Sequence, residues 1–158
     1  MPATTLDLLD VPLSLFSIPV VWMVGFAPTR LRVKMFRDTI GWNNLEPRTN
    51  LERLEKDPKV DKAFLLRLVR LEGAHQNGLE ALPLWASAVI AGNMVGMNNR
   101  TLNIYSALFV GGRVLFNYIY VAQKTKAHSY VRCVVWATTT GISLYMLVQS
   151  ALIRLRSV

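Results

Sequence analysis

Four apolar stretches, each able to cross a lipid bilayer, constrain this 158-residue chain more than any other feature. They lie at about residues 6–26, 64–97, 102–122 and 130–153. A membrane-spanning helix needs roughly 20 residues, and the second stretch reaches that length only by including the polar run GAHQNGLE (73–80). Residues 134–153, VVWATTTGISLYMLVQSALI, offer only Thr, Ser and Gln as polar side chains, whereas a soluble bundle needs a wide polar face on each helix. The sequence therefore predicts an all-α integral membrane protein, with one four-helix transmembrane bundle over residues 1–158.

The charges predict how the chain is oriented. All ten acidic residues lie at or before Glu80, although the net charge is +8. Basic residues gather at the ends of the apolar stretches, which is typical of membrane proteins and argues against a nucleic-acid binder. Eleven lie between residues 30 and 70, and three more surround the turn before the fourth stretch. The positive-inside rule therefore places the loop at about 37–60 in the cytosol and both chain ends outside it; Arg154 and Arg156 are the exceptions.

The inventory of ligating residues argues against metal chemistry. Cys133 is the single cysteine, so an internal disulfide and a cysteine-based zinc site are excluded. Glu72 and His75 have the spacing of a di-iron motif, but they form only one such pair. No Walker A, HExxH or GxSxG motif is present. We expect no metal site.

Polar side chains share one face near the predicted cytosolic end of three helices. They are Arg70, Gly73, Asn77 and Glu80, with His75 and Gln76 on either side; Arg113, Asn117 and Tyr120; and Ser129, Tyr130 and Arg132. Ionisable groups inside membrane spans usually face the bundle interior or a water-filled cavity. We expect these three groups to meet in one basic pocket with one carboxylate. The structural alternatives are a Glu80–Arg113 pair, an Asn77 hydrogen bond between helices, and Arg132 as an interfacial anchor.

The same residues carry a resemblance to a known family. The run AHQNGLEALP (74–83) resembles the A-H-x-N-x-x-E-x-x-P signature of the membrane-associated proteins in eicosanoid and glutathione metabolism. The runs RVLFNYIYVAQKTKAHSYVR (113–132) and TRLRVKMF (29–36) resemble that family's second signature and the basic end of its first helix. The resemblance covers essentially the whole chain.

The resemblance implies a homotrimer in which glutathione, the co-substrate, binds between protomers near the cytosolic face. It further implies a membrane of the endoplasmic reticulum, with the outer mitochondrial membrane as the other candidate, and a lipophilic substrate that enters from membrane lipid. Carried over by position, the glutathione-binding residues are Arg30, Arg70, His75, Gln76, Asn77, Glu80, Arg113, Tyr120 and Arg132. Arg132 is the predicted catalytic residue, beside the sulfur.

The resemblance implies the activity of a glutathione transferase or peroxidase, and the chemistry agrees with it, since a nearby cation favours the reactive thiolate. A non-catalytic member that binds lipid or activates a partner protein is the alternative. The chain departs from the family pattern at Gly73, where an arginine is expected, and Arg70, one turn earlier, is its candidate replacement. The segment before Arg132 is also longer than in the prostaglandin synthase branch, which leaves the register of Arg132 open.

Overall fold

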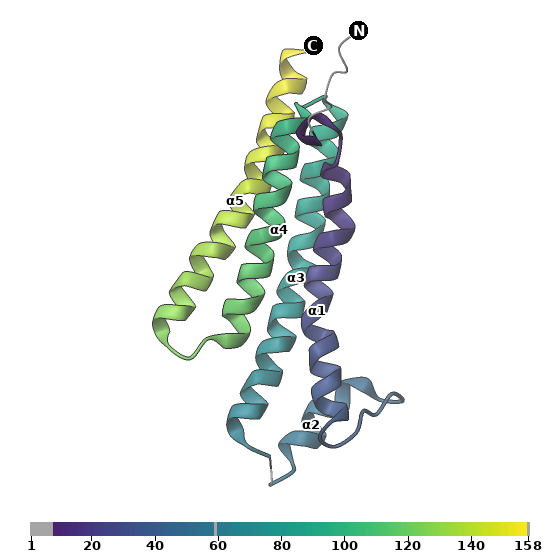
Figure 1. Ribbon diagram of the computed structural model, residues 1–158, viewed down its shortest axis with the longest axis vertical. Helices are drawn as coiled ribbons and strands as arrows, with labels where there is room; N and C mark the ends of the chain where they lie inside the picture. The colour runs from purple at the N-terminus through teal and green to yellow at the C-terminus, as the bar shows by residue number, and fades with distance from the viewer. Residues whose placement is uncertain (1–7, 59, 158) are drawn as a thin grey trace.

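Four long helices run alternately up and down and pack along one another (Figure 1). The computed structural model describes residues 8–58 and 60–157, and it contains no strand within them. The elements are η1 (Leu8–Asp10), η2 (Ser14–Phe16), α1 (Ser17–Arg37), η3 (Pro47–Thr49), α2 (Asn50–Glu55), α3 (Lys62–Met94), α4 (Asn99–Ala122) and α5 (Lys126–Arg156). The short helix α2 lies within the loop between α1 and α3.

Three of the helical segments in the described residues are long and apolar enough to cross a membrane. They are Ser14–Arg37, Asn99–Ala122 and Lys126–Arg156. The segment at 64–97 does form a helix, α3, but it does not meet this standard. The first half of α3 carries charged residues up to Glu80. Within a membrane, these polar side chains must be shielded from lipid by other parts of the protein.

The first helix lies further along the chain than its apolar pattern predicts. We expected a span at about 6–26, of which Leu6 and Asp7 lie outside the described residues; the helix instead runs from Ser17 to Arg37. Proline is tolerated in the first turn of a helix, where its missing N–H has no partner to lose, and Pro19 is the third residue of α1. Lys34 and Arg37 occupy the last turn, where positive charge is favourable. Arg30, Arg32, Lys34 and Arg37 therefore belong to the helix and not to a linker.

Two glycines allow α1 and α3 to touch. A Cβ atom built on Gly78 would lie 2.6 Å from the Gly25 Cα, which no real side chain tolerates. Next to this crossing, His75 Nδ1 lies 2.9 Å from the Gly25 carbonyl oxygen. Since a carbonyl only accepts, Nδ1 is the nitrogen that carries the proton.

A proline within α1 explains a further contact. Pro28 has no N–H, so the Val24 carbonyl loses its partner within the helix. Asn117 of α4 donates to that carbonyl at 2.8 Å. The asparagine therefore fastens α4 to α1 at the point where the α1 hydrogen-bond ladder is interrupted.

Two hydrophobic clusters lie at different heights in the bundle. In the upper one, Trp85 of α3 stacks on Phe109 of α4, with ring centres 4.0 Å apart. In the lower one, Leu54 of α2 packs against Phe36 and Leu68. This lower cluster folds the linker against the end of the bundle that holds the last turn of α1, the first turn of α3 and the α4–α5 turn. We call this the basic end.

At the basic end, α1 and α3 extend further than α4 and α5. In Figure 1 the α4–α5 turn lies well above the lower ends of α1 and α3, and the lower half of α5 leans away from them. Gly112 is where α4 and α5 come close, because a Cβ there would lie 2.4 Å from the Thr139 methyl carbon. The adjacent Gly111 and Gly112 together suggest close helix packing, but Gly111 has open space around it and only Gly112 makes such a contact.

Candidate functional site

The centre of the candidate site is a hydrogen bond between α3 and α4. Arg113 is only 2% exposed, and its Nη2 donates to Asn77 Oδ1 at 2.8 Å. The guanidinium also lies over the Phe116 ring, 4.5 Å from its centre. A buried cation needs such partners because burial without them is costly. Asn77 therefore forms a hydrogen bond between helices, as one of the structural alternatives predicts, and its partner is Arg113.

Glu80 lies one turn from Asn77 and keeps its carboxylate accessible. It makes no ion pair or hydrogen bond with any residue that the structure describes, so the alternative of a direct Glu80–Arg113 pair is not what is observed. Asn77 and Glu80 line a cavity of about 220 Å³, together with Trp136 and Thr140 of α5. The carboxylate is available to bind a cationic group that enters this space.

A second arginine is held at the basic ends of α4 and α5. The Arg132 guanidinium lies over the Tyr120 ring, with its central carbon 4.5 Å from the ring centre. Its nitrogens donate to Gln123 Oε1 at 3.0 Å and, more weakly, to the Ser129 hydroxyl at 3.4 Å. The longer segment before Arg132 therefore still brings this side chain against Tyr120.

Two aromatic rings connect the two arginines. Phe116 and Tyr120, one turn apart on α4, pack edge to face with ring centres 5.5 Å apart. Arg113 lies over the first ring and Arg132 over the second. The sequence pattern alone assigns no role to Phe116 or Gln123. The signal that could have found both was their helical spacing from Arg113 and Tyr120.

Gly73 faces this arrangement. A Cβ atom built on it would lie 2.5 Å from the Tyr120 hydroxyl oxygen and 3.0 Å from the ring carbon that carries it. The position where the family has an arginine is therefore occupied by the end of Tyr120. A larger residue at 73 requires Tyr120 to move.

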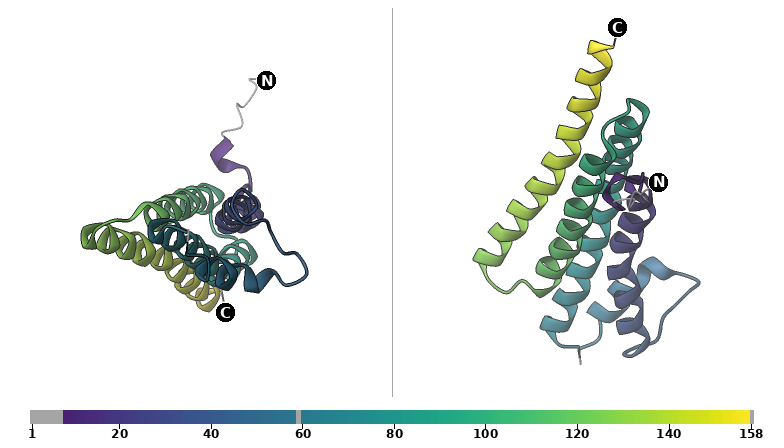
Figure 2. Two further views of the ribbon diagram at one scale, coloured as in Figure 1. Left: turned by 90° about the horizontal axis from the view of Figure 1, so that it is seen from below. Right: turned by 45° about the horizontal axis from the view of Figure 1, so that its top comes forward.

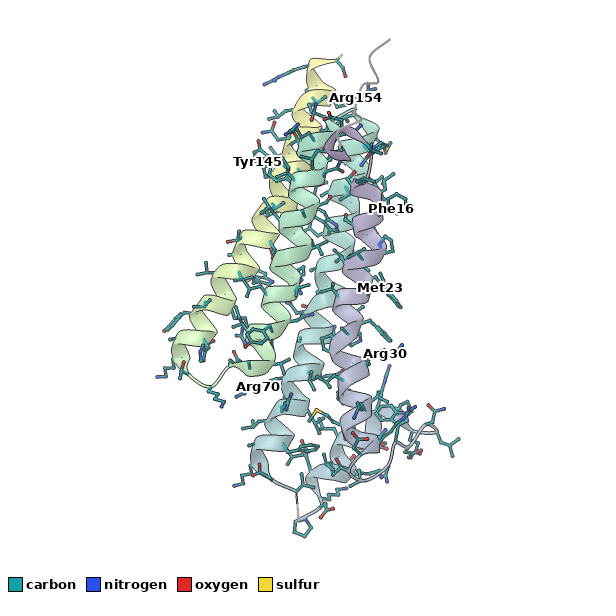
Figure 3. All side chains as sticks on the ribbon, in the orientation of Figure 1. Phe16, Met23, Arg30, Arg70, Tyr145 and Arg154 are labelled. Atoms are coloured by element: carbon teal, nitrogen blue, oxygen red, sulfur yellow. The ribbon has the colours of Figure 1, made fainter. Side chains whose placement is uncertain are left out.

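Four other predicted residues do not join this group within the protomer. His75 turns toward the Gly25 carbonyl of α1, and Gln76 is exposed. Arg70 lines a separate groove between α1, α3 and α4. Arg30 projects from the outer side of α1, and Figure 3 shows it on the opposite side of the α1–α3 pair from Arg70. Arg30, Arg70, His75 and Gln76 therefore lie apart from the Asn77–Arg113 and Tyr120–Arg132 contacts in a single protomer.

The candidate site offers hydrogen-bond donors and one free carboxylate. Within the part of the chain that the structure describes, no group of three or more His, Cys, Asp or Glu side chains could hold a metal ion. The charges that do converge suit a zwitterionic or anionic organic ligand, since arginine binds carboxylates and a carboxylate binds ammonium.

The helices and this site define an all-helical integral membrane protein with a polar site among its helices. The sequence pattern of the MAPEG family matches residues 12–152. The chain therefore belongs to the MAPEG family, whose members include glutathione transferases and related enzymes. No curated protein and no solved structure matches the chain.

Proposed function

We propose that this MAPEG protein is a membrane-bound glutathione transferase or glutathione-dependent peroxidase that acts on lipophilic electrophiles or lipid hydroperoxides. The observation that carries the proposal is the Arg132 guanidinium, fixed over Tyr120 by Gln123 and Ser129. A cation held beside a thiol lowers the thiol pKa and so favours the thiolate, which is the nucleophile. Arg132 would supply that cation.

The residues of the candidate site fit the charges of glutathione. Its ammonium group suits Glu80, the accessible carboxylate beside Asn77. Its carboxylates suit arginines, of which Arg113 and Arg132 are within the protomer. In a transferase the thiolate sulfur would bond to the electrophilic carbon as the leaving group departs with its electron pair. In a peroxidase it would attack the terminal peroxide oxygen, so that an S–O bond forms as the O–O bond breaks, and the alkoxide would take up a proton and leave as the lipid alcohol. The glutathione sulfenic acid would then react with a second glutathione to give glutathione disulfide and water.

The distribution of the predicted residues supports a site completed by a second protomer. Arg30 is exposed and lies on the opposite side of the α1–α3 pair from Arg70 (Figure 3), so in this proposal it serves the site of a neighbour. Gln76 and Glu80 lie on an exposed face of α3, and an uncovered carboxylate among apolar helices is costly in lipid. We propose a homotrimer in the endoplasmic reticulum, with glutathione bound between protomers on the cytosolic side.

The decisive experiment measures the thiolate of bound glutathione. Purified protein is titrated with glutathione, and thiolate is followed by its ultraviolet absorbance in the wild type and in Arg132→Ala. A cation near the sulfur lowers the pKa of the glutathione thiol. Without it, the fraction of bound glutathione present as thiolate at pH 7 should fall about tenfold or more. Arg154→Ala, at the far end of α5, is the control and should match the wild type. Unchanged thiolate in Arg132→Ala would refute the assigned role.

The non-catalytic alternative rests on Gly73. The arginine of the family pattern is absent and its space is filled by Tyr120, which removes one ligand contact. A non-catalytic member should show weak or no glutathione binding. It should also show no glutathione-dependent turnover of an aryl halide or a lipid hydroperoxide, and the same titration followed by these two assays separates the two functions.

A further inference from the structure

A large apolar groove lies at the basic end, apart from the Asn77–Arg113 and Tyr120–Arg132 groups. Its volume is about 820 Å³, within the range of roughly 300–1,000 Å³ for small-molecule sites. The walls come from three helices, with Leu31 on α1, Leu66 on α3 and Val121 on α4. Seen from below in the left panel of Figure 2, α1 and α4 lie on either side of the lower part of α3. The groove arises because α4 ends before α1 and α3 do.

Only positive charges line this groove. Arg67, Arg70 and Lys124 contribute to it, and no acidic residue does. Neither guanidinium of the pair Arg67 and Arg70 makes an ion pair or hydrogen bond with any residue in the described part of the chain. Three cations around one apolar space repel one another, and an anion among them would relieve that repulsion.

The groove opens on the outside of the bundle at the level where a membrane span ends. Tyr118 is 71% exposed and Leu66 is 54% exposed. Lys124 lies two residues beyond the end of α4, one of the helices that could cross a membrane. Apolar walls therefore extend toward the membrane interior from a rim of cations, which is the charge pattern of an amphiphile with an anionic head.

We infer that this groove binds an anionic phospholipid of the leaflet at the basic end. Its phosphate contacts Arg67, Arg70 and Lys124, and an acyl chain lies along Leu31 and Val121. Each lysine or arginine near an anionic membrane surface contributes measurable attraction. The inference rests on the membrane location of the chain and not on glutathione chemistry. It assigns Arg70 to lipid, where the sequence suggested a glutathione carboxylate.

Native mass spectrometry of the full protein tests this directly. The protein is released from detergent micelles that contain either phosphatidylserine or phosphatidylcholine, and retained lipid is counted. Arg67→Gln/Lys124→Gln should weaken phosphatidylserine retention about thirty-fold, the factor expected for two interfacial cations. Arg154→Gln/Arg156→Gln removes the same charge at the other end and should leave retention unchanged. Leu66→Trp, which fills the groove, should lower retention of both lipids, whereas Leu155→Trp should not.

Several outcomes would overturn the inference. One is equal phosphatidylserine retention in the wild type and Arg67→Gln/Lys124→Gln. Another is an equal loss in the Arg154→Gln/Arg156→Gln control, which would indicate a general charge effect. Displacement of the lipid by glutathione would assign the groove to the glutathione site. If the wild type retained no lipid and Leu66→Trp reduced the oligomeric mass, a second copy of the chain would be the occupant. Loss of thiolate in Arg132→Ala has no bearing on any of these results.

Discussion

At the scale of single residues, Gly73 and Tyr120 form one unit. Because Gly73 has no side chain, the Tyr120 ring can pack directly against the α3 backbone at this position. The position of that ring in turn determines where the Arg132 guanidinium stacks. A departure from the family pattern at one position is thus matched by a side chain from another helix. The space that an arginine side chain at position 73 would take therefore holds the hydroxyl of Tyr120.

This unit predicts how alanine at position 73 behaves. Gly73→Ala should reduce the free energy of unfolding by about 1–3 kcal/mol, because the added methyl overpacks the site and meets the Tyr120 hydroxyl. In a Tyr120→Phe background the cost should be smaller, since the nearest atom is gone. Chemical denaturation in detergent measures all four proteins of the cycle.

Gly111→Ala is the matched control for this prediction. Gly111 also lies within a helix, but a Cβ atom built on it would have nothing within 4 Å. Alanine there should be neutral or stabilise the protein by roughly 0.5–1 kcal/mol. An equal cost of Gly73→Ala with and without the Tyr120 hydroxyl would show that the contact does not limit this position.

At the scale of helices, the contact of α1 with α3 and α4 depends on an interrupted hydrogen-bond ladder. Pro28 leaves the Val24 carbonyl without its helical partner, and Asn117 supplies one from α4. His75 bonds to the next carbonyl, that of Gly25. Two polar side chains, Asn117 and His75, therefore hold the helices together at this level.

The Pro28–Asn117 relation predicts a non-additive pair of substitutions. Asn117→Leu should cost about 1–3 kcal/mol because it leaves the Val24 carbonyl unsatisfied in the interior. Pro28→Ala restores an N–H to α1, so the same change in that background should cost clearly less. Asn103→Leu is the control, since Asn103 bonds to the Leu9 and Val11 carbonyls and its cost, measured by chemical denaturation in detergent, should be the same in both backgrounds. Additive costs for Asn117→Leu and Pro28→Ala would contradict the relation.

The sequence predicts which segments are helical better than it predicts where a helix begins or where its side chains point. Length and hydropathy indicate the helical class, and the i, i+3 and i+4 spacing places Asn77 and Glu80 on one face of α3. The start of α1 at Ser17 is not predicted because the apolar run continues across it, while Pro12 and two short 3-10 turns precede it. His75 is missed for another reason. Its orientation is set by the Gly25–Gly78 crossing, a contact between residues far apart in the chain that periodicity cannot reveal.

At the scale of the whole molecule, one end concentrates most of the charge and all of the proposed chemistry. The linker with α2 lies at the basic end (Figure 1). The groove with its three cations and the Arg132 group lie near the end of α4 and the start of α5, which belong to the same end. The other end is fastened by neutral groups, such as the Trp85 donation to the Ser17 hydroxyl at 3.0 Å. The orientation of the chain in its membrane therefore decides which compartment supplies the polar co-substrate and which leaflet supplies the lipid.

Cysteine accessibility tests that orientation. In a Cys133→Ser background, Leu45→Cys lies in the linker, where Leu45 is 94% exposed, and Ser157→Cys lies just past the end of α5. The excess of lysine and arginine between residues 30 and 70 should keep the linker in the cytosol. A membrane-impermeant maleimide added to sealed vesicles with the cytosolic face outward should label Leu45→Cys directly and Ser157→Cys only after detergent; Cys133→Ser alone shows the background. The reverse pattern would mean that Arg154 and Arg156 prevail over the linker. It would place Arg67, Arg70 and Lys124 against the leaflet poorer in anionic lipid, so the lipid inference and the cytosolic site would both lose their electrostatic basis.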